Sequence, residues 1–213
     1  METTWICVLW IVGAYLVGAI PFGFVIGKLR GVDVHTVGSK NIGATNVFRT
    51  VGKKWGLLAF ACDFLKGLLP TLAAQLWARG CPDWLPLAVG VMCVVGHMLT
   101  PYMKFKGGKG VATAFGMLVA LVPWLVLTAF AVFAAVFAAT HYISLGSCTA
   151  AGFLAVGVWV PFVADVRFCG LARDLPQAAL ITAIALFVIW KHRSNIKRLV
   201  AGNENKIYLF RRA

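Results

Sequence analysis

A polar run at positions 38–49 has the residue types of a loop that binds an anion. It reads GSKNIGATNVFR and offers neutral hydrogen-bonding side chains at Ser39, Asn41, Thr45 and Asn46. Its small residues allow backbone N–H groups to approach an anion, and the planar guanidinium of Arg49 suits bidentate binding of phosphate. A structured loop that caps helix ends at the membrane surface would have a similar composition. The run alone leaves both interpretations open.

A second segment, KFKGGKG, combines glycines with lysines and contains Lys106, Gly107, Gly108, Lys109 and Gly110. Its glycines permit positive-φ conformations that turn successive N–H groups inward, and its lysines add positive charge, as in a phosphate nest. It is not a Walker A loop, because Gly110 follows Lys109 where Ser or Thr should bind magnesium. A helix break with a basic membrane anchor explains the segment equally well.

A third polar segment, KHRSN, lies at positions 191–195 after the last apolar stretch. On a helix, His192 and Asn195 would face the same side, with Arg198 one turn further along. An imidazole with a pKa near neutrality suits a general base. A single histidine at a helix C-terminus more often interacts with the helix dipole. A substrate role and a helix-end role are both open.

Two charged residues and a histidine lie within apolar stretches. Asp63 and Lys66 are three positions apart, and such pairs inside a membrane span usually face the protein interior. We expect either a structural ion pair or a pair that orients substrate. For His97, near the inner end of its span, we favour a packing role over that of a base.

The remainder of the chain predicts an all-α integral membrane protein. Its 213 residues are 61% hydrophobic, with a mean hydropathy of +0.85, against about 45–50% apolar residues in soluble domains. We see no internal repeat and expect a single polytopic membrane domain over residues 1–213. The first apolar stretch is expected to be a retained span, because its acidic start differs from the basic start of a signal peptide.

The basic residues predict the topology. Segments 28–54, 104–110 and 191–213 hold most of the 20 Lys and Arg residues, while only Arg79, Arg167 and Arg173 lie in the opposite connectors. All three basic segments reach the cytoplasmic side only if the stretch 111–140 crosses twice, turning at Pro123. This predicts seven transmembrane helices, with the N-terminus outside and the C-terminus cytoplasmic. The expected spans are approximately 5–27, 55–78, 85–103, 111–122, 124–140, 148–164 and 175–190.

The first half of the split stretch, 111–122, would span only about 18 Å, so the cytoplasmic mouth is expected to dip into the membrane. The same topology places the polar connector at 141–147 on the cytoplasmic side. The seven acidic residues are scattered singly, and no Cys/His metal spacing occurs. We therefore expect no metal and no cofactor. The net charge of +13 fits topology and anionic ligands or lipids, and we expect no nucleic-acid partner.

Several segments together resemble the bacterial acyl-phosphate-dependent glycerol-3-phosphate acyltransferases, a family of integral membrane enzymes. They are GSKNIGATNVFRTVGKK at 38–54, DFLKG at 63–67, GHMLTPYMKFKGGKGVAT at 96–113, ISLGS at 143–147 and HRSNIKRLVAGNENKI at 192–207. Each is weak alone, but their joint occurrence in family order is specific. Two departures are Lys40, where glycine is common, and Ser194, where glutamate is frequent.

The resemblance implies transfer of a fatty acyl group from acyl phosphate to the 1-hydroxyl of glycerol 3-phosphate. The products would be 1-acylglycerol 3-phosphate and phosphate, in the first step of phospholipid synthesis. By position it implies active-site residues Ser39, Arg49, Lys109, Ser147, His192 and Asn195. We expect the substrates to be bound by Asn41, Thr45, Lys106, Gly107, Gly108 and Gly110.

An acyl phosphate is already activated, so the glycerol hydroxyl attacks it directly without a covalent enzyme intermediate. Either His192 or a substrate phosphate oxygen would take the proton. The resemblance further implies a bacterial cytoplasmic (inner) membrane, an active site on the cytoplasmic side, contact with membrane lipid, and a soluble partner that produces acyl phosphate.

Other classes fit less well. Soluble-type glycerolipid acyltransferases use His-x4-Asp, and no histidine of this chain has Asp five positions later. A CDP-alcohol phosphotransferase needs clustered aspartates, which the sequence lacks. A carrier for phosphorylated metabolites stays open, although its polar groups should lie near the midplane of the bilayer instead of at one mouth. A purely structural membrane subunit is the remaining alternative.

Overall fold

The computed structural model describes residues 2–164 and 174–208. Within these ranges the chain is helical and contains no strand. The expected outer-side arginines Arg167 and Arg173, and the tail residues 209–213, lie outside the described residues. The chain divides into two compact units, Met1–Leu121 and Val122–Ala213. We call them unit 1 and unit 2 and describe each by itself. The expectation of a single domain over 1–213 stays a prediction.

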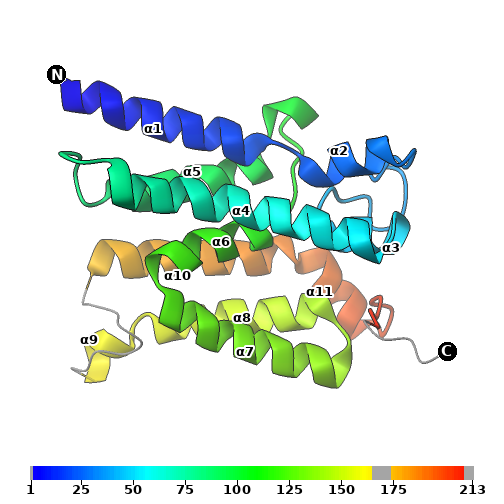
Figure 1. The fold of residues 1–213 in the computed structure, drawn as a ribbon. Coiled ribbons are helices and arrows are strands. Elements are labelled where there is room, and N and C mark those ends of the chain that lie inside the picture. The colour runs from blue at the N-terminus through cyan, green and yellow to red at the C-terminus, as the bar shows by residue number, and fades with distance from the viewer. Residues whose placement is uncertain (1, 165–173, 209–213) are drawn as a thin grey trace. The chain divides into compact units, whose positions relative to one another are not determined.

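Unit 1 is a bundle of helices (Figure 1). They are α1 (Glu2–Ala19), α2 (Phe22–Leu29), α3 (Ala44–Thr50), α4 (Lys53–Trp77), α5 (Leu85–Met98), the 3-10 helix η1 (Pro101–Met103) and α6 (Val111–Leu121). Helix α1 packs on α5, and α4 packs on α6. The first pair approaches closely at Gly18, where a Cβ atom would lie 2.2 Å from the carbonyl oxygen of Cys93. Small residues at such crossings are typical of helices that pack in membranes.

Unit 2 contains the helices α7 (Pro123–Thr140), α8 (Ile143–Gly157), α9 (Val160–Ala164), α10 (Leu175–Lys191) and α11 (Arg193–Val200). Helix α8 packs on both α7 and α10. The axes of α10 and α11 differ by 53°, and the bend falls at His192. After α11 the chain returns toward the start of α8, where the Ile207 N–H donates to the carbonyl of His141 at 2.9 Å. This return positions the C-terminal segment against the polar end of α8.

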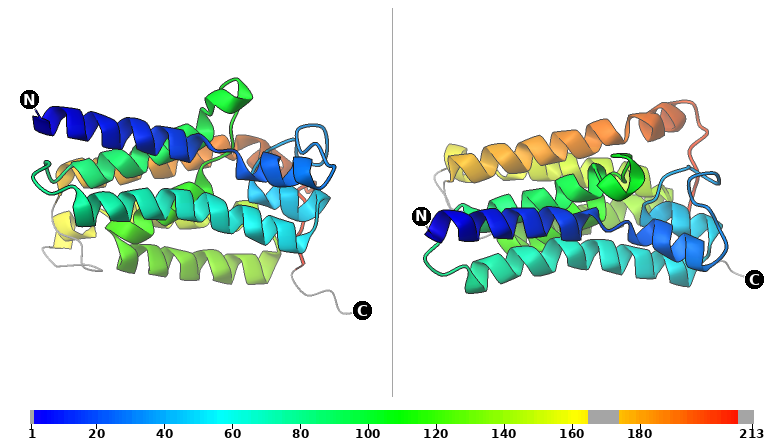
Figure 2. Two further views of the ribbon diagram at one scale, coloured as in Figure 1. Left: turned by 45° about the horizontal axis from the view of Figure 1, so that its top comes forward. Right: turned by 90° about the horizontal axis from the view of Figure 1, so that it is seen from above.

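Several helical stretches are long and apolar enough to cross a membrane. Five of them are Thr3–Leu29, Lys53–Trp77, Leu85–Met103, Pro123–Thr140 and Ile143–Ala164, and the bent pair α10 and α11 would be a sixth. The first comprises α1 and α2, whose succession is visible in Figure 2. The stretch 111–140 forms two helices, with α6 ending at Leu121 and α7 beginning at Pro123. Proline is well suited to the first position of a helix, because the N–H it lacks has no intrahelical partner there.

Candidate active site

Asn46 holds the polar loop of unit 1 together. Its side chain is buried, with the residue 1% exposed. Its Nδ2 donates to the carbonyls of Val34 at 2.9 Å and Val37 at 3.2 Å, and its Oδ1 accepts from the Ser39 N–H at 2.8 Å. The expectation that Asn46 offers its hydrogen bonds to a substrate is therefore wrong, because the loop itself uses them. The side chain instead fixes the backbone that carries Ser39.

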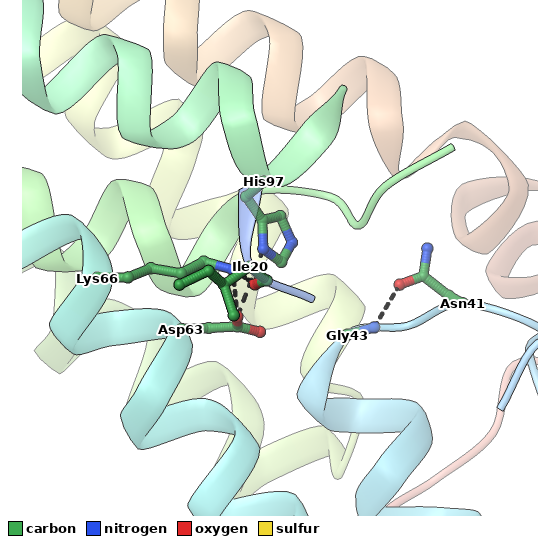
Figure 3. A network of polar contacts seen from close by, with 6 residues as sticks. All are labelled: Ile20, Asn41, Gly43, Asp63, Lys66 and His97. Atoms are coloured by element: carbon green, nitrogen blue, oxygen red, sulfur yellow. Dashed lines mark hydrogen bonds and ion pairs between the residues drawn. The ribbon is translucent and has the colours of Figure 1, made fainter. Parts of the chain in front are cut away.

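The remaining predicted residues of this loop lie around the start of α3. Asn41 Oδ1 accepts from the Gly43 N–H at 2.8 Å (Figure 3), an Asx turn that leads into the helix. Thr45 and Arg49 are four residues apart on α3 and therefore share one side of it. Lys40 adopts φ 57°, in the left-handed region. This conformation explains why glycine suits the position, since a Cβ atom is unfavourable there.

The glycine loop at 106–110 caps the C-terminal end of α5. The N–H of Gly107 donates to the carbonyl of Met98, and that of Gly108 to the carbonyl of His97, both at 3.1 Å. Only Gly110 among the three glycines has a positive φ, of 80°. The expected nest of inward N–H groups is therefore not formed by Gly107 and Gly108, because helix-end carbonyls take their hydrogen bonds. Both glycines shape the loop that carries the two lysines.

A buried charge network lies where α4 faces the end of α5 (Figure 3). Lys66 Nζ lies 2.6 Å from Asp63 Oδ1, and His97 Nδ1 lies 3.5 Å from the same oxygen. Lys66 Nζ also donates to the carbonyl of Ile20 at 2.8 Å, at the break between α1 and α2. The side chains of Asp63 and Lys66 are each 2% exposed. The pair is an internal ion pair that links three helical elements of unit 1.

In unit 2, the carboxylate of Glu204 contacts three polar side chains. Glu204 Oε1 accepts from Ser144 Oγ at 3.0 Å and from Asn195 Nδ2 at 2.7 Å. Its Oε2 pairs with Arg198 Nε at 2.7 Å. Asn195 and Arg198 therefore face the same side of α11, as their spacing predicts. The amide of Asn195 is oriented by this contact, with its Nδ2 turned to Glu204.

The ionised form of Glu204 is favoured by these contacts. Burial by itself would raise the pKa of this carboxyl group. Hydrogen bonds from Asn195, Arg198 and Ser144, together with the positive charge of Arg198, outweigh that effect and hold the pKa below its usual value of 4.5. Glu204 is therefore a fixed negative charge and a hydrogen-bond acceptor at neutral pH.

His192 lies at the bend between α10 and α11 and is 4% exposed. Its Nδ1 lies 2.8 Å from the carbonyl oxygen of Val188. A carbonyl oxygen only accepts hydrogen bonds, so Nδ1 carries a proton and donates it. In the neutral ring the basic lone pair is then on Nε2. This hydrogen bond favours the neutral tautomer in which Nε2 can accept a proton.

Ser147 lies in the second turn of α8 and is 7% exposed. The sequence suggested a connector over 141–147, but the helix begins earlier, at Ile143. Gly146 does not interrupt it, because that glycine packs against Phe133 of α7, with a Cβ position 2.9 Å from the ring. Ser147 is therefore carried by a helix and not by a flexible connector.

The predicted residues thus fall into two sets. Unit 1 contains Ser39, Asn41, Thr45, Arg49, Lys106, Gly107, Gly108, Lys109 and Gly110, and unit 2 contains Ser147, His192 and Asn195. Sequence reasoning missed the part played by Glu204. The available signal was its position, since it is the acidic residue within the basic segment at 192–207.

The chain is similar to known proteins along most of its length. The family model described as glycerol-3-phosphate acyltransferase matches residues 8–202. A glycerol-3-phosphate acyltransferase of Trichlorobacter lovleyi is 48% identical over 198 residues, which cover 92% of this chain and 95% of the relative.

Two solved structures are similar along nearly the whole chain. Both are crystal structures of PlsY (YgiH), an integral membrane glycerol 3-phosphate acyltransferase. The glycerol 3-phosphate form is 40% identical with a TM-score of 0.83, covering 95% of this chain and 96% of the other. The lysophosphatidic acid form is 38% identical with a TM-score of 0.78, covering 95% of each chain. The helices of this chain are long and apolar enough for a multi-pass membrane protein. With this family match and these relatives, the chain belongs to the glycerol-3-phosphate acyltransferase family of integral membrane enzymes.

Proposed function

We propose that the protein transfers a fatty acyl group from acyl phosphate to the 1-hydroxyl of sn-glycerol 3-phosphate. The observation that carries this proposal is the similarity to PlsY structures in glycerol 3-phosphate and lysophosphatidic acid forms over 95% of this chain. An acyl acceptor and an acylated product of that kind require an activated acyl donor. The basic loops of this chain suit a donor that carries phosphate.

In the proposed reaction the glycerol hydroxyl oxygen attacks the carbonyl carbon of the acyl phosphate. The new ester C–O bond forms, the bond from carbon to the bridging phosphate oxygen breaks, and inorganic phosphate leaves with that electron pair. The hydroxyl proton passes to His192 Nε2 or to a phosphate oxygen of a substrate. Because the anhydride is already activated, positioning and charge neutralisation supply most of the acceleration.

The predicted active-site residues have different chemical roles in this proposal. Arg49 offers a bidentate fork for the phosphate of one substrate, and Lys106 and Lys109 add positive charge for the phosphate of the other. Neutral donors such as Ser39 and Asn195 suit the developing oxyanion. We assign supporting roles to Ser147 and to the loop residues Asn41, Thr45, Gly107, Gly108 and Gly110.

We also propose the finer topology. It has seven spans, with the short α6 as the one that crosses least of the bilayer, since its 11 residues extend for only about 16 Å. The N-terminus is outside, and the polar loops face the cytosol across a bacterial inner membrane. On this side a soluble enzyme that makes acyl phosphate would deliver the donor.

The test is an assay of purified protein with palmitoyl phosphate and glycerol 3-phosphate, measuring phosphate release and lysophosphatidate. We expect product with palmitoyl phosphate and none with palmitoyl-CoA. Arg49→Ala should abolish turnover, and Arg49→Lys, which keeps the charge but not the bidentate fork, should recover only a small part of it. Product formed equally well from palmitoyl-CoA would refute the proposed donor.

A second variant addresses the base. His192→Ala should lower kcat by about 100-fold or more if Nε2 takes the proton, and wild-type turnover in this variant would move that role to a substrate phosphate. If well-folded wild-type protein forms no product with either donor, uptake of glycerol 3-phosphate into proteoliposomes would test the carrier alternative.

A further inference from the structure

The glycine loop packs directly against one edge of the His97 ring. A Cβ atom placed on Gly108 would lie 2.1 Å from His97 Nε2, and one placed on Gly107 would lie 2.0 Å from the His97 carbonyl oxygen. These positions are far closer than van der Waals contact. The ring and its backbone therefore form the surface on which the loop lies, and the orientation of the ring sets where Gly108 sits.

The other edge of the same ring faces a buried carboxylate. His97 Nδ1 lies 3.5 Å from Asp63 Oδ1 (Figure 3). In the described part of the chain His97 Nδ1 makes no regular hydrogen bond, so Asp63 acts on this nitrogen through a longer electrostatic contact. His97 is 4% exposed, and water is therefore a poor substitute for the carboxylate.

The carboxylate is itself held in place. Lys66 Nζ lies 2.6 Å from Asp63 Oδ1 and donates to the Ile20 carbonyl at 2.8 Å. The Ile20 carbonyl lies at the break between α1 and α2, next to Pro21, which has no N–H. The contacts therefore run from the α1–α2 break through α4 and the end of α5 to the glycine loop.

From this chain of contacts we infer that Asp63 and His97 are positioning residues for the glycine loop, which they hold in the shape that binds substrate phosphate. The inference rests on the proposed function, because that function assigns a substrate phosphate to the loop through Lys106 and Lys109. Asp63 fixes the rotation of the His97 ring, and the ring in turn fixes the backbone of Gly108. A site held by such a supporting shell loses affinity when the shell is loosened.

The experiment measures kcat and KM for glycerol 3-phosphate at saturating palmitoyl phosphate. We expect His97→Ala and Asp63→Asn to raise KM by about 10- to 100-fold, as for a misplacement of about 1 Å, with a smaller change in kcat. Because Asp63→Asn leaves Lys66 charged and unpaired, the neutral double variant Asp63→Asn/Lys66→Met is measured beside it. That variant removes the buried pair as a unit, so we expect it to fold, yet it deprives His97 of its carboxylate.

A double-mutant cycle tests the contact with the loop. Gly108→Ala alone should raise KM, because its methyl group collides with the ring. In the His97→Ala background the same methyl group enters vacated space, so the combined effect on KM should be smaller than the product of the two single effects. Purely additive effects would contradict the packing argument.

Lys109→Ala separates this inference from the proposed function. If Lys109→Ala raises KM while folded His97→Ala and Asp63→Asn/Lys66→Met variants retain the wild-type KM, the positioning role is refuted and the phosphate loop stands. If Lys109→Ala leaves KM unchanged, the assignment of phosphate to this loop fails, and the positioning role fails with it. Thermal unfolding of each variant in detergent shows which ones are folded.

Discussion

Asp63 in unit 1 and Glu204 in unit 2 are both buried carboxylates with a basic partner, but Glu204 also accepts from two neutral donors. The Asp63 side chain is 2% exposed and pairs with Lys66, three residues away on the same helix. The Glu204 side chain is 1% exposed and accepts hydrogen bonds from Ser144 of α8 and from Asn195 and Arg198 of α11. Each carboxylate thus has a charged partner close by in the sequence, but Glu204 also accepts from Ser144, which is 60 residues away.

This difference predicts different responses to mutation. A pair with both members on one helix is removed as a unit by two substitutions, and it leaves no buried charge behind. In the Glu204 cluster, removing Arg198 as well would leave no unpaired charge, but it would not replace the acceptor that the neutral donors lose. These neutral donors, Ser144 and Asn195, stay buried and polar whatever replaces the carboxylate.

The largest effect is expected when the local pair is broken from one side. Lys66→Met leaves Asp63 as an uncompensated buried charge and should destabilise the protein by about 3–5 kcal/mol. Adding Asp63→Asn should restore most of that loss, since no charge then remains. Thermal unfolding in detergent measures both variants. Equal destabilisation by the single and double variants would show that the pair contributes through packing and not through charge.

Removal of the Glu204 side chain should have the next largest effect. Glu204→Ala leaves the buried donors of Asn195 and Ser144 without their acceptor, which costs about 2–3 kcal/mol. Turnover should fall as well, because Asn195 loses its orientation. Glu204→Gln keeps an acceptor oxygen at one position and should retain more stability than Glu204→Ala, as judged by melting temperature and by kcat. If both variants melt and turn over like the wild type, the cluster does not position Asn195.

The Glu204 cluster should also respond measurably to acid. Glu204 has a pKa below 4.5 in the folded protein, so its stabilising contribution is complete above its unfolded pKa. That contribution is lost as the pH falls through the folded pKa, below 4.5. The difference in melting temperature between wild type and Glu204→Gln should therefore be constant from pH 7 to about pH 5 and shrink at lower pH. A difference that stays constant down to pH 3 would contradict this prediction.

The smallest effect concerns the backbone, where the described part of unit 1 contains more left-handed non-glycine residues than the described part of unit 2. Among the residues that the structure describes, the non-glycine residues with positive φ are Lys40, Lys104 and Phe105 in the polar loops of unit 1 and His141 in unit 2. Lys40→Gly should relieve left-handed strain and stabilise the protein by about 0.5–1 kcal/mol after the entropy of glycine is subtracted. Lys40→Ala is the matched control, since it removes the charge but keeps the Cβ atom. An equal gain in both variants would attribute the effect to charge.

Much of the helical architecture was predictable because apolar composition and proline positions act locally. The break at Leu121–Pro123 followed from the ring of a single proline. The start of α8 at Ile143 did not, because a short polar sequence with serine and glycine resembles a loop until packing against Phe133 is considered. The Asp63–Lys66 pair and its interior position were expected from its spacing within an apolar stretch, but only the tertiary structure shows that it faces His97.

The sequence by itself determined the membrane class, the helical periodicity and the family, since these depend on composition and on residues that are close together or in fixed order. Only the tertiary structure showed that Asn46 is used to hold its own loop, that Gly107 and Gly108 donate to the end of α5, and that Glu204 orients Asn195. Each of these contacts joins residues whose pairing depends on the folded path of the chain. A hydrogen bond requires a partner within about 3 Å, and residue type alone does not reveal which partner the fold brings that close.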